Sequence, residues 1–307
     1  MSITNSLLSF YSTSLNKDVK IRAYNIGNRV KNIVLLLEPY GYHSENPFGT
    51  RILHYLSQLD NTLIIEPDAS LGIPVKIKTE VNDFKNLKRG CWYVNSPYAG
   101  NYLTAFSEIV KYFLEKYEIK NRIYVTGASM GGWGSILFSS YYPDLFQGAI
   151  SVDGPAFFGK SFLIVERNLD VLTKMTGVDS ETTLQYFKDM IETLDFIFTN
   201  NQLLKTIKVE GNEVTVDKSL FSRWELWFPI NVIEKARKDV EYHIIVNYFD
   251  TTTLLSDEKL HEKMMKLDIP HEYIVFLGKK EASHFTGIVD GFKYVAYILK
   301  EKLASNK

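Results

Sequence analysis

Residues 123–134 read Ile-Tyr-Val-Thr-Gly-Ala-Ser-Met-Gly-Gly-Trp-Gly, and the interpretation of this 307-residue chain starts from them. The β-branched and aromatic first half predicts a strand, and the Gly-x-Ser-x-Gly that follows predicts a tight turn into a helix. Ser129 would lie at the tip of such a nucleophile elbow, with a strained backbone. Glycines at 127 and 131 fit this geometry, because side chains there would collide with the neighbouring strand and helix. A plain Gly/Ser-rich turn carries the same letters, so the elbow needs support from the rest of the chain.

The segments around the elbow alternate between buried strands and helices. Strands are predicted at apolar runs, namely 32–37, 62–66, 122–126, 148–152, 241–247 and 272–276. Helices are predicted where apolar residues recur every three or four positions, at 50–59, 102–117, 258–267 and 286–302. Two runs at 7–11 and 19–24 predict an antiparallel hairpin. Together they predict an α/β fold with a mostly parallel central sheet and helices on both faces.

The pattern changes between residues 155 and 240, where helical segments carry many aromatic side chains. We expect this part to be a helical cap inserted over the carboxyl edge of the sheet, within a single domain that spans residues 1–307. Most of its aromatic residues are expected to form a local core. The stretch 68–100 is irregular and long for a loop in a compact domain, which favours a functional role for it.

The composition excludes several kinds of partner. Lysine and arginine total 35 against 36 aspartates and glutamates, and the basic residues are dispersed, so neither nucleic acid nor a membrane surface is indicated. The single cysteine, Cys91, leaves no intramolecular disulfide and no cysteine metal cluster, and it is expected to be a small buried side chain. No stretch approaches transmembrane length and residues 1–5 do not resemble a signal peptide. We therefore expect a cytoplasmic protein that binds a small molecule or a carbohydrate.

A serine nucleophile needs a histidine base, which in turn needs a carboxylate to orient it. In a sheet of this order the acid and then the histidine follow the serine, on loops at the carboxyl ends of later strands. His284 alone meets this rule, since it lies in the predicted loop 280–285 after the last strand. The other five histidines either precede the serine or lie in a strand, in a helix or at the wrong end of a strand: His43, His54, His243, His261 and His271.

Two aspartates follow the strand at 241–247 and compete for the role of the acid. Asp250 stands three residues beyond the strand end, where this carboxylate usually emerges, and is preferred. Asp257 is the alternative, although its place just before the predicted helix also suits an N-terminal cap. Asp153, at the end of the strand 148–152, ranks third.

The negatively charged oxygen that forms during attack needs two backbone N–H donors. The first is expected from Met130, directly after the nucleophile. The second is expected from the loop that follows the strand 32–37, where Tyr40 and then Gly41 form a natural turn.

The chain resembles the esterase D and feruloyl esterase branch of the α/β-hydrolases, which also includes bacterial mycolyltransferases. The resemblance covers residues 30–155 well and 240–300 loosely, and rests on Gly127-Ala128-Ser129-Met130-Gly131-Gly132-Trp133-Gly134, Tyr142-Pro143-Asp144-Leu145-Phe146, Ser151-Val152-Asp153-Gly154 and Trp92-Tyr93. It implies a serine carboxylesterase or acyltransferase that works through an acyl-enzyme without a metal or an organic cofactor. The roles it carries over are Ser129 as nucleophile, His284 as base, Asp250 as acid, and Tyr40 and Met130 as oxyanion donors.

Two positions depart from the pattern of that family. Glu38-Pro39 stands where the family usually has His-Gly, and Tyr248-Phe249-Asp250 stands in place of a Gly-x-x-Asp signature.

Three hypotheses about the function follow from the sequence. The first is a serine carboxylesterase acting on a small or carbohydrate-linked ester. The second is an O-acetyltransferase-type enzyme acting on a sugar or polysaccharide hydroxyl. The third is a binding protein that keeps the hydrolase frame without activity.

Overall fold

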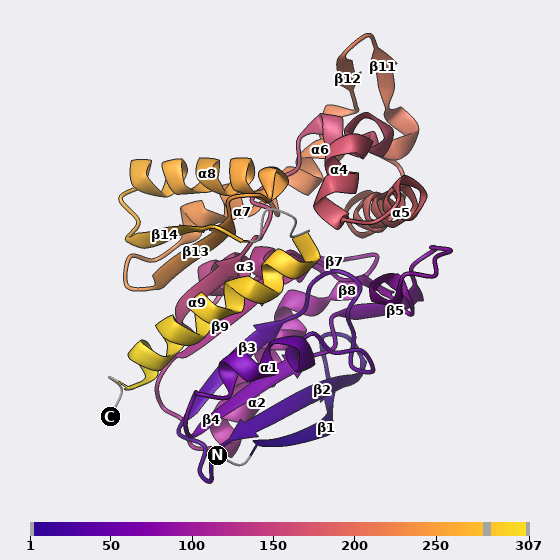
Figure 1. The fold of residues 1–307 in the computed structure, drawn as a ribbon. Helices are drawn as coiled ribbons and strands as arrows, with labels where there is room; N and C mark the ends of the chain where they lie inside the picture. The colour runs from indigo at the N-terminus through magenta and orange to yellow at the C-terminus, as the bar shows by residue number, and fades with distance from the viewer. Residues whose placement is uncertain (1–2, 279–283, 305–307) are drawn as a thin grey trace.

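Among the described residues, 3–278 and 284–304, eight strands form one sheet in the order β1-β2-β4-β3-β9-β10-β13-β14 (Figure 1). β1 pairs antiparallel with β2, β2 pairs antiparallel with β4, and the other neighbours pair parallel. The strands are β1 (Ile3–Ser12), β2 (Lys17–Ile26), β3 (Asn32–Leu37), β4 (Thr62–Pro67), β9 (Ile123–Ala128), β10 (Phe146–Val152), β13 (Glu241–Asn247) and β14 (His271–Phe276). The predicted α/β sheet and its N-terminal hairpin are confirmed.

Helices cover both faces of the sheet because alternate side chains of each central strand enter different cores. In β3, Val34 and Leu36 pack in the core that α1 and α9 cover, whereas Leu35 and Leu37 pack in the core that α2, α3 and α8 cover. These helices are α1 (Gly49–Leu56), α2 (Tyr102–Lys116), α3 (Met130–Tyr141), α8 (Thr251–Lys266) and α9 (His284–Ala304). Within the described residues, no helix is both long enough and apolar enough to cross a membrane.

Residues 155–240, which we call the insertion, are mainly helical. Its elements are η2 (Lys160–Leu163), η3 (Val165–Asn168), α4 (Leu169–Thr176), α5 (Ser180–Thr199), η4 (Leu204–Thr206), β11 (Lys208–Glu210), β12 (Glu213–Thr215), α6 (Lys218–Glu225), α7 (Pro229–Val232) and η5 (Ile233–Lys235). Figure 1 shows α4, α5, α6 and the β11–β12 hairpin grouped beyond one end of the sheet. Trp224 and Phe228 are buried in the hydrophobic core, as expected for the aromatic residues of this part. The small hairpin is an element that the sequence pattern does not reveal.

The long irregular stretch 68–100 contains short strands rather than a bare loop. They are β5 (Ser70–Pro74), β6 (Lys88–Gly90), β7 (Asn95–Ser96) and β8 (Gly100–Asn101), with a single 3₁₀ turn, η1 (Asn82–Phe84). β5 pairs with β6 and β7 pairs with β8, both antiparallel. Cys91 is buried, as predicted.

Two helices near the C-terminal end begin earlier than predicted. α8 begins at Thr251 and not at residue 258, because Asp250 caps it and accepts a hydrogen bond from the N–H of Thr253. Asp257 therefore lies inside this helix and is not its N-terminal cap, which was the alternative interpretation of its place in the sequence. α9 begins at His284 and not at residue 286, while residues 280–283 of the predicted loop lie outside the described residues.

Candidate active site

Ser129 lies at a sharp corner between β9 and α3. Its backbone has φ 53° and ψ −119°, and its N–H donates to the carbonyl of Val152 at 2.9 Å. A Cβ at Gly131 would lie 2.1 Å from the carbonyl oxygen of Leu37, and a Cβ at Gly127 would lie 2.6 Å from the backbone of Gly131. Both glycines are thus required by close backbone contacts, in the way that a nucleophile elbow requires them.

His284 and Asp250 meet although 34 residues separate them. The Nδ1 of His284, at the first turn of α9, makes a short hydrogen bond to the Oδ2 of Asp250, and both side chains are buried. Burial by itself lowers the pKa of His284, but the charge and hydrogen bond of Asp250 outweigh burial, so the pKa is raised. The reverse holds for Asp250: burial raises its pKa, and the larger combined effect of His284 and of hydrogen bonds with Thr253 leaves it lowered. The pair therefore favours a charged carboxylate that orients the imidazole, with Nε2 left for a second partner.

Asp153 and Asp257 lie near this pair, and both are completely buried. Neither oxygen of Asp257 has a hydrogen-bond partner among the described residues, and burial together with Asp153 and Asp250 raises its pKa well above the ordinary value. Asp153 accepts a hydrogen bond from the N–H of Asn247 at 2.7 Å, and burial and the charge of Asp250 raise its pKa to about 8. The negative charge of the three carboxyls is therefore concentrated on Asp250, the one that contacts His284.

Ser129 and His284 both line a cavity of about 520 Å³. Among the described residues that line this cavity, only Lys259 is charged at neutral pH, apart from the titratable His284. The rest of the wall is mostly apolar and comes from the insertion, α8 and the residue after His284: Pro155, Phe157, Phe158, Phe162, Val171, Met175, Tyr186, Phe187, Met190, Leu255 and Phe285. Trp92, which the sequence singles out within its aromatic pair, closes part of the wall. Most aromatic residues of the insertion are expected to form a local core, and some of them, such as Phe158 and Phe187, belong to the core and also line this cavity.

The two expected oxyanion residues lie beside the elbow but are not among the residues that line the cavity. Met130 is the first residue of α3, where backbone N–H groups have no partner within the helix. Tyr40 is buried in the turn after β3, and a Cβ at Gly90 would lie 2.4 Å from the Sδ of Met130 and 3.2 Å from a ring carbon of Tyr40. The side chains of Met130 and Tyr40 therefore both lie next to Gly90.

The unusual Glu38 next to this turn has a clear structural contact on each side. Its carboxyl accepts a hydrogen bond from the N–H of Ala69 at 3.1 Å, and its carbonyl accepts one from the hydroxyl of Tyr93 at 2.8 Å. Burial and the neighbouring Glu66 and Asp68 raise the pKa of Glu38 well above its ordinary value, which favours the neutral form. Glu38 therefore has a structural role: its contacts with Ala69 and Tyr93 help to hold the turn in place.

No family model and no curated protein sequence matches the chain. Solved structures do match it along almost its whole length. A ferulic acid esterase is 12% identical over 97% of this chain and 98% of its own, with a TM-score of 0.58. The fluorophosphonate-binding serine hydrolase F of Staphylococcus aureus is 13% identical over 97% and 98%, with a TM-score of 0.60. MPT51 of Mycobacterium tuberculosis is 10% identical over 97% and 98%, with a TM-score of 0.63. The chain shares the architecture of these structures and has the α/β-hydrolase fold.

Proposed function

We propose that the protein is a serine carboxylesterase with Ser129 as nucleophile, His284 as base and Asp250 as the orienting acid. One observation carries the proposal: His284, which is paired with the buried Asp250, lines the same cavity as the strained Ser129. A serine, a histidine and a buried carboxylate are the parts that acyl transfer requires.

In this mechanism the hydroxyl of Ser129 attacks the ester carbonyl while Nε2 of His284 takes its proton. The N–H groups of Met130 and Tyr40 stabilise the oxyanion, and the protonated His284 then delivers its proton to the leaving alcohol. Water attacks the resulting acyl-enzyme with His284 again as base, and the acid product leaves. Asp250 stays ionised throughout and stabilises the imidazolium.

The lining of the cavity favours an apolar acyl group, either aromatic or of medium chain length. Each methylene that moves from water into contact with Phe158, Phe187 or Met190 contributes about 0.8 kcal/mol to binding. We propose a small ester of this kind as the substrate, with the alcohol facing the opening. Hydrolysis of p-nitrophenyl esters should therefore become more efficient from acetate to hexanoate.

Acyl transfer to a sugar or polysaccharide hydroxyl is the second candidate, because the same apolar wall disfavours water in the second step. Adding a carbohydrate acceptor to the ester assay separates the two. An acylated sugar that forms at the expense of the free acid would support transfer, and an unchanged yield of free acid would support hydrolysis.

The experiment that tests the proposal is labelling with a fluorophosphonate probe, which reacts with activated serines. The wild type should be labelled and Ser129→Ala should not. Ser161→Ala is the matched control, since it removes another serine hydroxyl from the same cavity away from the elbow, and it should be labelled like the wild type. An unlabelled wild type would support the binding-protein hypothesis, and labelling of Ser129→Ala would show that the reactive serine lies elsewhere.

A further inference from the structure

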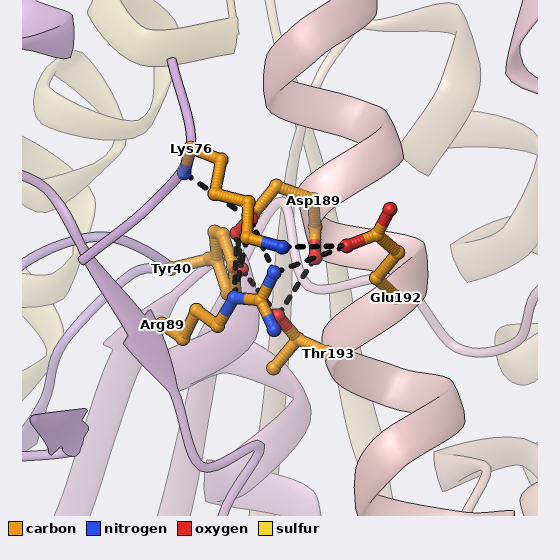
Figure 2. A network of polar contacts seen from close by, with 6 residues as sticks. All are labelled: Tyr40, Lys76, Arg89, Asp189, Glu192 and Thr193. Atoms are coloured by element: carbon orange, nitrogen blue, oxygen red, sulfur yellow. Dashed lines mark hydrogen bonds and ion pairs between the residues drawn. The ribbon is translucent and has the colours of Figure 1, made fainter. Parts of the chain in front are cut away.

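Helix α5 of the insertion is tied to the core of the molecule by a polar network that Figure 2 shows from close by. At its centre is Asp189, whose side chain is 2% exposed, paired with Arg89 of β6, whose side chain is 11% exposed. The Nε of Arg89 lies 3.1 Å from both carboxylate oxygens, and Nη2 lies 2.5 Å from Oδ1. A guanidinium that grips a carboxylate with two nitrogens fixes direction as well as distance. The remaining members of the network are Tyr40, Lys76, Glu192 and Thr193.

The same carboxylate reaches the turn after β3. The hydroxyl of Tyr40 donates to Oδ2 of Asp189 at 3.0 Å and shares a hydrogen bond of 2.8 Å with the hydroxyl of Thr193. Burial raises the pKa of Tyr40 far above its ordinary value and the charge of Asp189 adds to this, so the phenol keeps its proton and donates. The carbonyl of Tyr40 in turn accepts from the hydroxyl of Tyr186 at 3.2 Å. Helix α5 therefore holds Tyr40 at its side chain and at its main chain.

Strand β6 holds the turn from the other side. The N–H of Lys88 donates to the carbonyl of Gly41 at 3.0 Å, directly before Arg89 in the sequence. Gly41 has φ 102°, a conformation that other residues rarely adopt. The turn is thus fixed between β6 and α5, and the two elements are joined to each other by the Arg89–Asp189 pair. None of these contacts uses the N–H of Tyr40, which is the group that the proposed mechanism requires.

We propose that Asp189 and Arg89 are positioning residues for the oxyanion site: Asp189 of the insertion and Arg89 of β6 together hold the turn that presents the N–H of Tyr40. This inference rests on the proposed function. It gives the insertion a part in the chemistry besides lining the cavity. Loss of one oxyanion donor lowers kcat about 10²–10³-fold, and a displaced donor should cost about 10–100-fold. KM should change little, because the donor acts on charge that develops only in the transition state.

The test is a double-mutant cycle of Asp189→Asn and Tyr40→Phe, with p-nitrophenyl hexanoate as substrate. Each single variant should lower kcat about 10–100-fold and change KM by less than about threefold. The double variant should be no slower than the slower single variant, because both act through one turn. Lys188→Gln is the matched control: it breaks an ion pair of α5 with Glu166 that does not involve the turn, and it should keep the wild-type kcat.

Urea unfolding of each variant establishes that it is folded in the assay. Tyr40→Phe removes a single hydroxyl, so it serves on its own if Asp189→Asn does not fold. Losses in kcat that multiply in the double variant, or a rise in KM with unchanged kcat, would overturn the inference and leave the esterase intact. A wild type that neither hydrolyses the ester nor takes up the fluorophosphonate probe would overturn the proposed function and this inference with it.

Discussion

Replacing Asp153 with asparagine should make the protein more stable at neutral pH. The carboxyl of Asp153 is completely buried, and its pKa is raised from 3.8 to about 8 by burial and by the charge of Asp250. Asparagine has the same shape, does not titrate, and can still accept the hydrogen bond that the N–H of Asn247 donates at 2.7 Å. The variant should therefore keep the local structure. It should also remove the loss of stability that arises because the folded protein holds a proton on Asp153 at neutral pH.

The size of the effect follows from the proton that the folded chain retains. Between pH 3.8 and about 8 the folded protein keeps this proton while the unfolded chain has released it, so the free energy of unfolding falls as the pH rises. The slope is about 1.4 kcal/mol for each pH unit, which gives about 4 kcal/mol at pH 7. Asp250 acts with the opposite sign, because its lowered pKa contributes stability above the pKa of the unfolded carboxyl that is lost as the pH falls.

Urea unfolding of the wild type and Asp153→Asn, measured from pH 4 to pH 8, tests this reasoning. The difference between their free energies of unfolding should grow in favour of the variant by about 3–4 kcal/mol between pH 4 and pH 7. Asp18→Asn, which changes an exposed aspartate of β2, should follow the wild type at every pH. Parallel curves for the wild type and Asp153→Asn would refute the argument, and so would a difference that grows in the opposite direction.

Three further predictions concern the elbow and the histidine. Gly131→Ala places a Cβ 2.1 Å from a backbone carbonyl of β3 and should destabilise the protein by at least about 3 kcal/mol in urea unfolding, whereas Gly159→Ala, with its nearest atom 3.7 Å away, should change it by less than about 1 kcal/mol. Asp250→Asn should lower kcat about 10³–10⁴-fold in the ester assay, while Asp257→Asn should lower it less than about tenfold. Because Asp250 raises the pKa of His284, kcat/KM should fall as the pH drops through that raised pKa, and the midpoint should move to lower pH in Asp250→Asn.

The order of the strands and helices could be predicted because buried strands and helices have characteristic spacings of apolar residues in the sequence. Strands such as β3 are buried on both faces and are therefore almost continuous apolar runs. The start of α8 could not be predicted in this way. Three threonines at 251–253 are poor helix formers, so the predicted helix begins only at residue 258. With that start, Asp257 also suits an N-terminal cap, although the structure has Asp250 in that place.

The candidate site also has a part that could be predicted from local sequence patterns and a part that could not. Ser129, His284 and Asp250 can be located from a local motif and from the order of strands, since the carboxyl ends of parallel strands meet at one edge. The contacts of Asp189 cannot, because its partners Arg89 and Tyr40 lie 100 and 149 residues away in the sequence. Nothing periodic marks such a pair, and only the packed insertion brings it together.

The backbone at Ser129 sets folding against chemistry at a single residue. Its φ of 53° is a conformation that costs a residue with a side chain about 1–3 kcal/mol and that glycine adopts freely. A Ser129→Gly variant would be inactive, and it should be more stable than the wild type because glycine adopts this backbone conformation without strain. The backbone at residue 129 would then be free to change, so a crystal structure of that variant would not preserve the geometry of the elbow. Alanine removes the hydroxyl but has a Cβ, so the backbone strain remains. Ser129→Ala is therefore the variant in which to bind an uncleaved ester for a crystal structure.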